Sequence, residues 1–88
     1  MEFDWDNAKE ERNRKKHRID FRTATKVFAD PFVVDFESRD PSGETRFNAI
    51  GLVDGRMLVV TYAIRDDVIR IISARGADPH EKRKYHEV

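Results

Sequence analysis

Arginine side chains accompany a β-prone run near the carboxyl end of the chain. Residues 65–85 read RDDVIRIISARGADPHEKRKY, with Arg70 inside the apolar run and Arg75 at its end. A short run rich in β-branched residues predicts a strand that is apolar on both faces, as in the middle of a sheet. A guanidinium group is costly to bury without a partner. We therefore expect these arginines either to form ion pairs or to face an anionic ligand.

The phosphodiester is the anionic ligand that suits such arginines best. One guanidinium binds two phosphate oxygens at once, and a cluster of them stabilises the charge that develops on a pentacovalent phosphorane. His17 could serve as a general acid or base, as could a perturbed Glu81, Tyr85 or lysine. Cleavage of RNA by its own 2′-hydroxyl needs no further groups, so the sequence is compatible with a metal-independent nuclease.

A structural role is the alternative for the same arginines. On that interpretation they pair with acidic residues that lie nearby in sequence, in ion pairs that each contribute little to stability. The sequence leaves both interpretations open. The arginines are Arg46, Arg65, Arg70 and Arg75, and the expected acidic partners are Asp66, Asp67 and Glu81.

Several other classes of site lack their motifs. The chain has three histidines, no cysteine and no HExxH, so the usual zinc spacings are missing. It has no glycine-rich phosphate loop and no GxSxG nucleophile motif. We expect no metal and no cofactor. The lack of cysteine fits a reducing cytoplasm, and no apolar run approaches the roughly 18–20 residues that span a bilayer. We therefore expect a cytoplasmic protein without membrane contact.

Charge is unevenly distributed along a chain whose formal net charge is zero. Residues 9–26 hold eight lysines and arginines against three acids, whereas residues 30–54 hold six acids against two arginines. This segregation predicts one electropositive and one electronegative surface. Within the basic stretch, one face of a predicted helix carries Lys9, Asn13, Lys16 and His17. That face is either an ordinary solvated surface or a ridge that binds a nucleic-acid backbone.

The local signals predict one α+β domain over residues 1–88, with an antiparallel meander sheet, two amino-terminal helices and one carboxyl-terminal helix. Asp6 can cap the first helix, and Asp78 followed by Pro79 can begin the last one. Asp30 precedes a proline and should end the second helix. The expected strands are 3–5, 32–37, 45–53, 56–64 and 68–74, and the expected helices are 7–17, 22–29 and 80–86.

Two tight turns set the expected register of the sheet. If residues 54–55 and 66–67 are two-residue turns, Arg46, Ala63 and Arg70 share one row on one face, with Arg65 just beyond. In this register Ala74 joins the arginine-bearing face and Arg75 points to the opposite one. The face opposite the arginines should pack against the helices. Its expected members are Phe47, Leu58, Val60, Tyr62, Ile69 and Ile71.

The chain resembles the BrnT family of type II toxin–antitoxin toxins from about Phe3 to Tyr85. The resemblance is carried by FDWDNAK at residues 3–9, DP at 30–31, GRMLVVTY at 55–62 and IRIISAR at 69–75. One position departs from the family pattern. The family usually has glycine after its KH pair, where this chain has Arg18. That glycine would ease the turn between the first two helices.

The resemblance implies a RelE-like fold and a ribonuclease that inhibits translation. It also implies a BrnA-like antitoxin with a ribbon-helix-helix part, through which alone the toxin would reach operator DNA. The catalytic candidates are Arg65, Arg75, Glu81, Tyr85 and His17, and the RNA-binding candidates are Arg46, Arg70, Lys9 and Lys16. The alternatives are a non-catalytic protein-binding module and a degenerate toxin that acts only as a co-repressor with its antitoxin.

Overall fold

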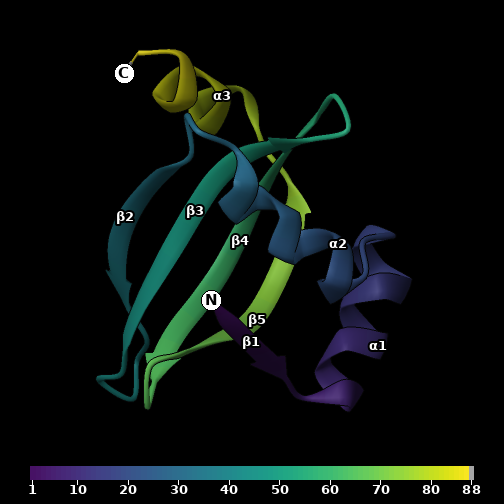
Figure 1. Ribbon diagram of the computed structural model, residues 1–88, viewed down its shortest axis with the longest axis vertical. Helices are drawn as coiled ribbons and strands as arrows, with labels where there is room; N and C mark the ends of the chain where they lie inside the picture. The colour runs from purple at the N-terminus through teal and green to yellow at the C-terminus, as the bar shows by residue number, and fades with distance from the viewer. Residues whose placement is uncertain (88) are drawn as a thin grey trace.

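The computed structural model describes residues 1–87 as an α+β fold built on a five-stranded mixed sheet (Figure 1). The strand order is β1-β5-β4-β3-β2, and β2 to β5 form the predicted antiparallel meander. The prediction of a wholly antiparallel sheet is wrong at one edge, where β1 runs parallel to β5. Helices separate β1 from the meander, so no hairpin turn dictates its direction. The strands are β1 (Glu2–Trp5), β2 (Val34–Arg39), β3 (Thr45–Val53), β4 (Arg56–Arg65) and β5 (Val68–Gly76).

The first and last helices begin close to where their caps predict, whereas α2 begins at Phe21, one residue earlier than expected. The Asp6 carboxylate accepts hydrogen bonds from two backbone N–H groups at the start of α1, and Asp78 forms a capping box with Glu81 at the start of α3. The predicted second helix is divided into a short α-helix and a 3₁₀ turn. No helix within residues 1–87 is long and apolar enough to cross a membrane. The elements are α1 (Asn7–His17), α2 (Phe21–Thr25), the 3₁₀ helix η1 (Lys26–Ala29) and α3 (Pro79–His86).

The two faces of the sheet are covered differently. One face packs against α2 and η1, which cross the sheet in Figure 1, and it carries the main core. All six side chains predicted for this face contribute to it. The opposite face is covered at one end by α3, where Tyr85 packs against Ile50, Met57 and Val59. Within residues 1–87, the helix that packs on this face is α3, and side chains beyond it such as Arg65 and Arg75 reach solvent.

A β-bulge in β5 changes the predicted register. Both two-residue turns form, with Val53 opposite Arg56 and Arg65 opposite Val68. The pairing then shifts by one residue between Thr61 and Tyr62 of β4. On β5, Ile71 is opposite Tyr62 whereas Ser73 is opposite Thr61, so Ile72 is the extra residue. Side chains after Ile72 therefore point to the face opposite the one that strict alternation predicts.

The bulge corrects two predictions about the end of β5. Ala74 was expected beside the arginines but is fully buried in the core under α2 and η1, together with Ile71. Arg75 was expected on the face opposite Arg70, yet it lies opposite Val59, on the face that α3 partly covers. One extra residue between Arg70 and Arg75 thus places both arginines on the same side of the sheet.

The polar helix α1 attaches to the sheet through one buried amide. Asn13 is 8% exposed, and its Nδ2 donates to the carbonyl oxygens of Ile19 (3.1 Å) and Ala74 (2.8 Å). Its Oδ1 accepts from the backbone N–H of Ala74 at 3.1 Å. β1 pairs only with residues 68–71 of β5, so the Asn13 amide takes the place of a strand partner farther along that edge. The sequence suggested an exposed Asn13; the structure buries it.

Arg18 adopts the conformation that favours glycine. It ends α1 with φ of 62° and ψ of 30°, and its N–H donates to the carbonyl oxygen of Arg14 at 2.8 Å. This left-handed geometry is common at the end of a helix, where the residue that adopts it is usually glycine or asparagine. It is disfavoured for other residues because of their Cβ atom. The structure therefore explains why a glycine suits the turn between the first two helices.

Candidate functional site

Four arginines from three neighbouring strands lie on the sheet face that α3 partly covers. Arg46 comes from β3, Arg65 from β4, and Arg70 and Arg75 from β5. Glu44 contacts both Arg46 and Arg65, and Arg70 is paired with Ala63 in the sheet register. We call these four residues the arginine face. The sequence predicted three of the four together, and the bulge adds the fourth.

Every member of the arginine face has a carboxylate partner. Glu81 pairs with Arg75, as the sequence suggested, but Asp66 and Asp67 are not the partners of the other three. Both are exposed, with positive φ, in the turn between β4 and β5. The partners come from other segments: Asp40 lies 3.2 Å from Arg46, Glu44 lies 3.6 Å from Arg46 and 2.8 Å from Arg65, and Asp4 lies 3.4 Å from Arg70.

The pair between Arg75 and Glu81 has the tightest geometry on this face. Each Glu81 carboxylate oxygen accepts from a different guanidinium nitrogen of Arg75, and both distances are 2.7 Å. Oε1 also accepts from the backbone N–H of Asp78 at 3.0 Å. The hydrogen bonds from Arg75 are the main reason that the pKa of Glu81 lies below its usual value. Glu81 is thus a buried anion that holds Arg75, whose own side chain remains 42% exposed.

Tyr85 lies on the same side of the sheet but toward its other edge. Its hydroxyl donates to the Asp30 carboxylate at 2.7 Å, and this hydrogen bond raises the pKa of Tyr85. The same Asp30 oxygen accepts from the backbone N–H of Leu52 in β3 at 2.7 Å. Since β4 lies between β3 and β5 in the sheet, the hydroxyl is separated from Arg75 by a strand.

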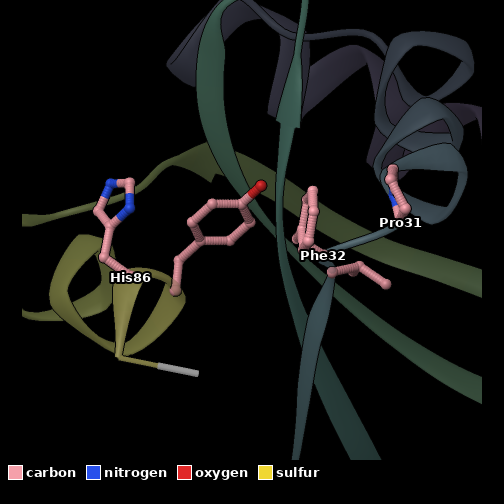
Figure 2. Close-up of a pocket in the computed structure, with 5 residues that line it drawn as sticks. Pro31, Phe32 and His86 are labelled. Carbon is pink, nitrogen blue, oxygen red and sulfur yellow. The ribbon is translucent and has the colours of Figure 1, made fainter.

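A pocket of about 380 Å³ adjoins Tyr85. Figure 2 shows His86 on α3 on one side of it, with Phe32 and Pro31 on the opposite side. The Phe32 side chain is 71% exposed, which is unusual for an aromatic residue of this size. The pocket is mixed in character and contains none of the residues of the arginine face.

The basic side chains of α1 line a second hollow, of about 250 Å³, against β5. It contains three of the predicted site residues, Lys9, Lys16 and His17. Sequence analysis missed Arg12, although its spacing from Lys9 and Lys16 places it on the same helical face. It also missed Ser73, because only the bulge brings that residue here. We call the set the α1 hollow; its members are Lys9, Arg12, Asn13, Lys16, His17, Ile72 and Ser73.

Comparison with protein families finds a match that spans most of the chain. The family is described as "Ribonuclease toxin, BrnT, of type II toxin-antitoxin system", and the match covers residues 5–81. No curated protein matches the chain. The matched range includes the whole arginine face, its partner Glu81 and the α1 hollow, whereas Tyr85 lies beyond its end.

Proposed function

The chain belongs to the BrnT family of ribonuclease toxins of type II toxin–antitoxin systems, and from this we propose that it is a metal-independent endoribonuclease that inhibits translation by cutting RNA. The observation that carries this proposal is the β-bulge of β5, which adds Arg75 to the face that holds Arg46, Arg65 and Arg70. Guanidinium groups arrayed along one open sheet face suit the repeated phosphates of an RNA strand.

The proposed reaction uses the nucleophile that RNA itself carries. The 2′-hydroxyl oxygen attacks the adjacent phosphorus, and the bond from phosphorus to the 5′-oxygen of the next nucleotide breaks. A base takes the proton from the 2′-hydroxyl, and an acid gives a proton to the departing 5′-oxygen. The products are a 2′,3′-cyclic phosphate and a 5′-hydroxyl. We assign the charge on the phosphorane to arginine and one of the proton transfers to His17.

Distances along the sheet divide the arginines among different phosphates. Arg75 lies opposite Val59, and Arg65 lies six residues farther along β4. At about 3.3 Å per residue this is a separation of roughly 20 Å, too far for both side chains to hold one phosphate. We therefore assign the reacting phosphate to Arg75, whose guanidinium Glu81 orients. Arg46, Arg65 and Arg70 bind the flanking backbone by exchanging their carboxylate partners for phosphates.

Glu81 is assigned as a positioning residue, and Tyr85 as a residue that stabilises the fold. Both oxygens of Glu81 are engaged by Arg75, and its lowered pKa is the reverse of what a proton-transfer group near pH 7 needs. The Tyr85 hydroxyl is committed to Asp30. Glu81 therefore acts through Arg75, the residue that it holds.

The family supports a protein antitoxin as the partner. We propose that a BrnA-like antitoxin with a ribbon-helix-helix part neutralises the toxin and carries it to operator DNA. The α+β architecture, with helices on an antiparallel meander, supports assignment to the RelE-like fold. The ion pairs of the arginine face favour one second candidate, a non-catalytic module that exchanges these carboxylates for an acidic partner.

Induction of the gene, followed by an RNA-cleavage assay with purified protein in EDTA, tests the proposal. We expect growth arrest that the adjacent open reading frame relieves, and cleavage that survives chelation. Arg75→Ala should lower the cleavage rate by about 100-fold, the usual effect of removing one preorganised donor to a transition-state oxyanion. The control is Arg22→Ala, an exposed arginine on α2, across the sheet from the arginine face. Equal rates for both variants would contradict the assignment, and no cleavage by folded wild-type protein would favour the binding module.

A further inference from the structure

The positive side chains of the α1 hollow form no ion pair among residues 1–87. Lys9, Arg12 and Lys16 line the hollow together, and none of the three forms an ion pair within that range. In the arginine face, in contrast, each arginine has an ion-pair partner. Three like charges around one hollow repel one another and destabilise the fold slightly. Such an arrangement is stabilised when an anion enters.

The hollow also has a neutral donor at its edge. Ser73 lines it from β5 and lies opposite Thr61, and its hydroxyl makes no hydrogen bond within residues 1–87. The Asn13 amide at the base is already committed to Ile19 and Ala74. An anion in the hollow would therefore meet the cations and the Ser73 hydroxyl and would not disturb the attachment of α1.

The hollow borders the arginine face. Along β4, the row of Thr61 and Ser73 lies midway between the row of Arg75 and the row of Arg70. The charges of Lys9 in the hollow and Arg70 on the arginine face both act on Asp6, which agrees with this placement. The pKa of Asp6 is lowered mainly by backbone N–H groups at the start of α1, and the charges of Lys9 and Arg70 both add to the shift. A single strand that follows β5 would thus pass the mouth of the hollow between two arginines.

We propose that the α1 hollow binds one phosphodiester of the RNA strand, with Arg12 and Lys16 supplying charge and Ser73 a hydroxyl donor. This rests on the proposed function, because it names a subsite for the same substrate. It adds Arg12 and Ser73, which the sequence did not indicate. It also means that the bulge of β5 shapes both surfaces that would contact the RNA, the arginine face and the α1 hollow. Arg70 and Arg75 share a face because of the bulge, and Ser73 reaches the hollow for the same reason.

Salt dependence of RNA binding tests the proposal directly. The probe is a 2′-O-methyl oligonucleotide, which lacks the nucleophilic hydroxyl and stays intact. For single strands, the slope of log K against log salt falls by about 0.7 for each phosphate that the protein no longer neutralises. The double variant Arg12→Gln/Lys16→Gln should therefore lower the slope by about 0.7, and lower the affinity by at least about tenfold. Ser73→Ala, which changes no charge, should cost roughly 2- to 10-fold in affinity.

A matched control exists on the same helix. Arg14 and Lys15 form a separate basic cluster with Arg18, on the side of α1 away from the hollow. Arg14→Gln/Lys15→Gln removes the same two residue types and the same net charge. Arg12, Lys16, Arg14 and Lys15 are all exposed, so both double variants should keep the wild-type unfolding midpoint.

The outcomes separate this proposal from the proposed function. A loss of affinity and slope confined to the Arg12/Lys16 variant supports it. Equal losses in both double variants would show attraction to net charge alone and would overturn it. Wild-type affinity in both variants, with cleavage of ordinary RNA intact, would overturn the subsite and leave the nuclease standing. Weaker antitoxin binding with unchanged RNA binding would overturn it too and make the hollow a protein site. Failure of wild-type protein to bind any RNA would overturn both proposals.

Discussion

At the scale of single residues, the pair between Glu81 and Arg75 fixes the orientation of one guanidinium group on the arginine face. Arg75 is the only one of the four arginines whose partner engages it with two hydrogen bonds of 2.7 Å to separate carboxylate oxygens. Glu81 is also tied to the backbone of Asp78 at the start of α3. A rigid carboxylate behind the guanidinium fixes its orientation, which is what a preorganised donor to a developing charge requires.

We therefore expect Glu81→Gln to weaken both activity and stability. The amide keeps the shape but leaves the Arg75 charge without its anion, which should lower the free energy of unfolding at pH 7 by on the order of 1 to 2 kcal/mol. RNA cleavage should fall without loss of RNA affinity, since the proposed assignment leaves three arginines to bind the flanking phosphates. Urea unfolding and single-turnover cleavage measure the two effects, and the exposed Glu37→Gln is the control.

The lowered pKa of Glu81 predicts how the stability difference between wild type and Glu81→Gln changes with pH. The pKa of Glu81 is lower in the folded protein than its ordinary value of 4.5. Its stabilising effect is therefore fully present above that ordinary value and is lost as the pH falls through the lower, folded pKa. The stability difference between wild type and Glu81→Gln should be constant near neutral pH and should shrink in acid. A difference that grows on acidification would contradict the assignment of Glu81 as an anion.

At the scale of elements, α1 depends on polar bonds to an unusual degree. Asn13 is its only buried residue, and its three hydrogen bonds satisfy backbone groups of β5 and of the segment after the helix. Buried backbone groups that lose their partners are costly. The attachment of α1 to β5, and with it the α1 hollow, therefore depends mainly on one amide side chain, while Glu10 accepts a hydrogen bond from the backbone N–H of Phe21 in α2.

Asn13→Ala should detach this helix from the sheet. Three backbone groups would lose their partners, which we expect to cost on the order of 3 kcal/mol in the free energy of unfolding. Hydrogen exchange at the Ala74 amide should accelerate more than exchange at amides in the middle of β4. Asn7→Ala, an exposed change at the start of the same helix, should stay within about 0.5 kcal/mol of wild type. Equal effects of the two variants would show that α1 is held by other contacts.

Elements with local signals could be predicted from the sequence, and those fixed by distant contacts could not. Asp6 and Asp78 are read from short-range capping preferences, and the two tight turns from the aspartates and glycine within them. The bulge at Ile72 has no such signal, because Ile71, Ile72 and their neighbours suit either face of a strand. The parallel pairing of β1 likewise depends on a contact between the two ends of the chain.

The candidate site divides in the same way. Arg46, Arg65 and Arg70 could be grouped from turn geometry alone, because the register is correct up to the bulge. Their carboxylate partners were not predictable, because Asp4, Asp40 and Glu44 approach only after the sheet has assembled. The position of Ser73 could not be predicted for the same reason as that of Arg75, because both residues follow the extra residue of the bulge.

At the scale of the whole molecule, Asp30 connects three parts of the fold. One oxygen accepts from Leu52 of β3 and from the Tyr85 hydroxyl of α3, and the other accepts from the backbone N–H of Phe32. These hydrogen bonds hold together the end of η1, the end of β3 and the last turn of α3. This gives the Asp30-Pro31 pair of the sequence a structural purpose beyond ending a helix.

Tyr85→Phe should therefore affect stability and leave catalysis almost unchanged. Loss of one hydrogen bond to a carboxylate should lower the urea midpoint of unfolding, while RNA cleavage should stay near the wild-type rate. The control is Tyr62→Phe on the opposite face, where the hydroxyl donates to Asp35 at 2.8 Å. The two variants should lose similar stability in urea. A fall of about 100-fold or more in cleavage for Tyr85→Phe alone would instead make this hydroxyl a proton donor.

The pairing of β1 with β5 also determines how late in synthesis the sheet can be completed. Glu2 lies opposite Val68, so β1 has no partner strand until 66 more residues have been added. At about 5 to 20 residues per second this delay lasts roughly 3 to 13 s. Arg70 and Arg75 are added within the same late segment. A nascent chain therefore has no finished arginine face, and the proposed antitoxin, if made alongside it, would have those seconds in which to bind first.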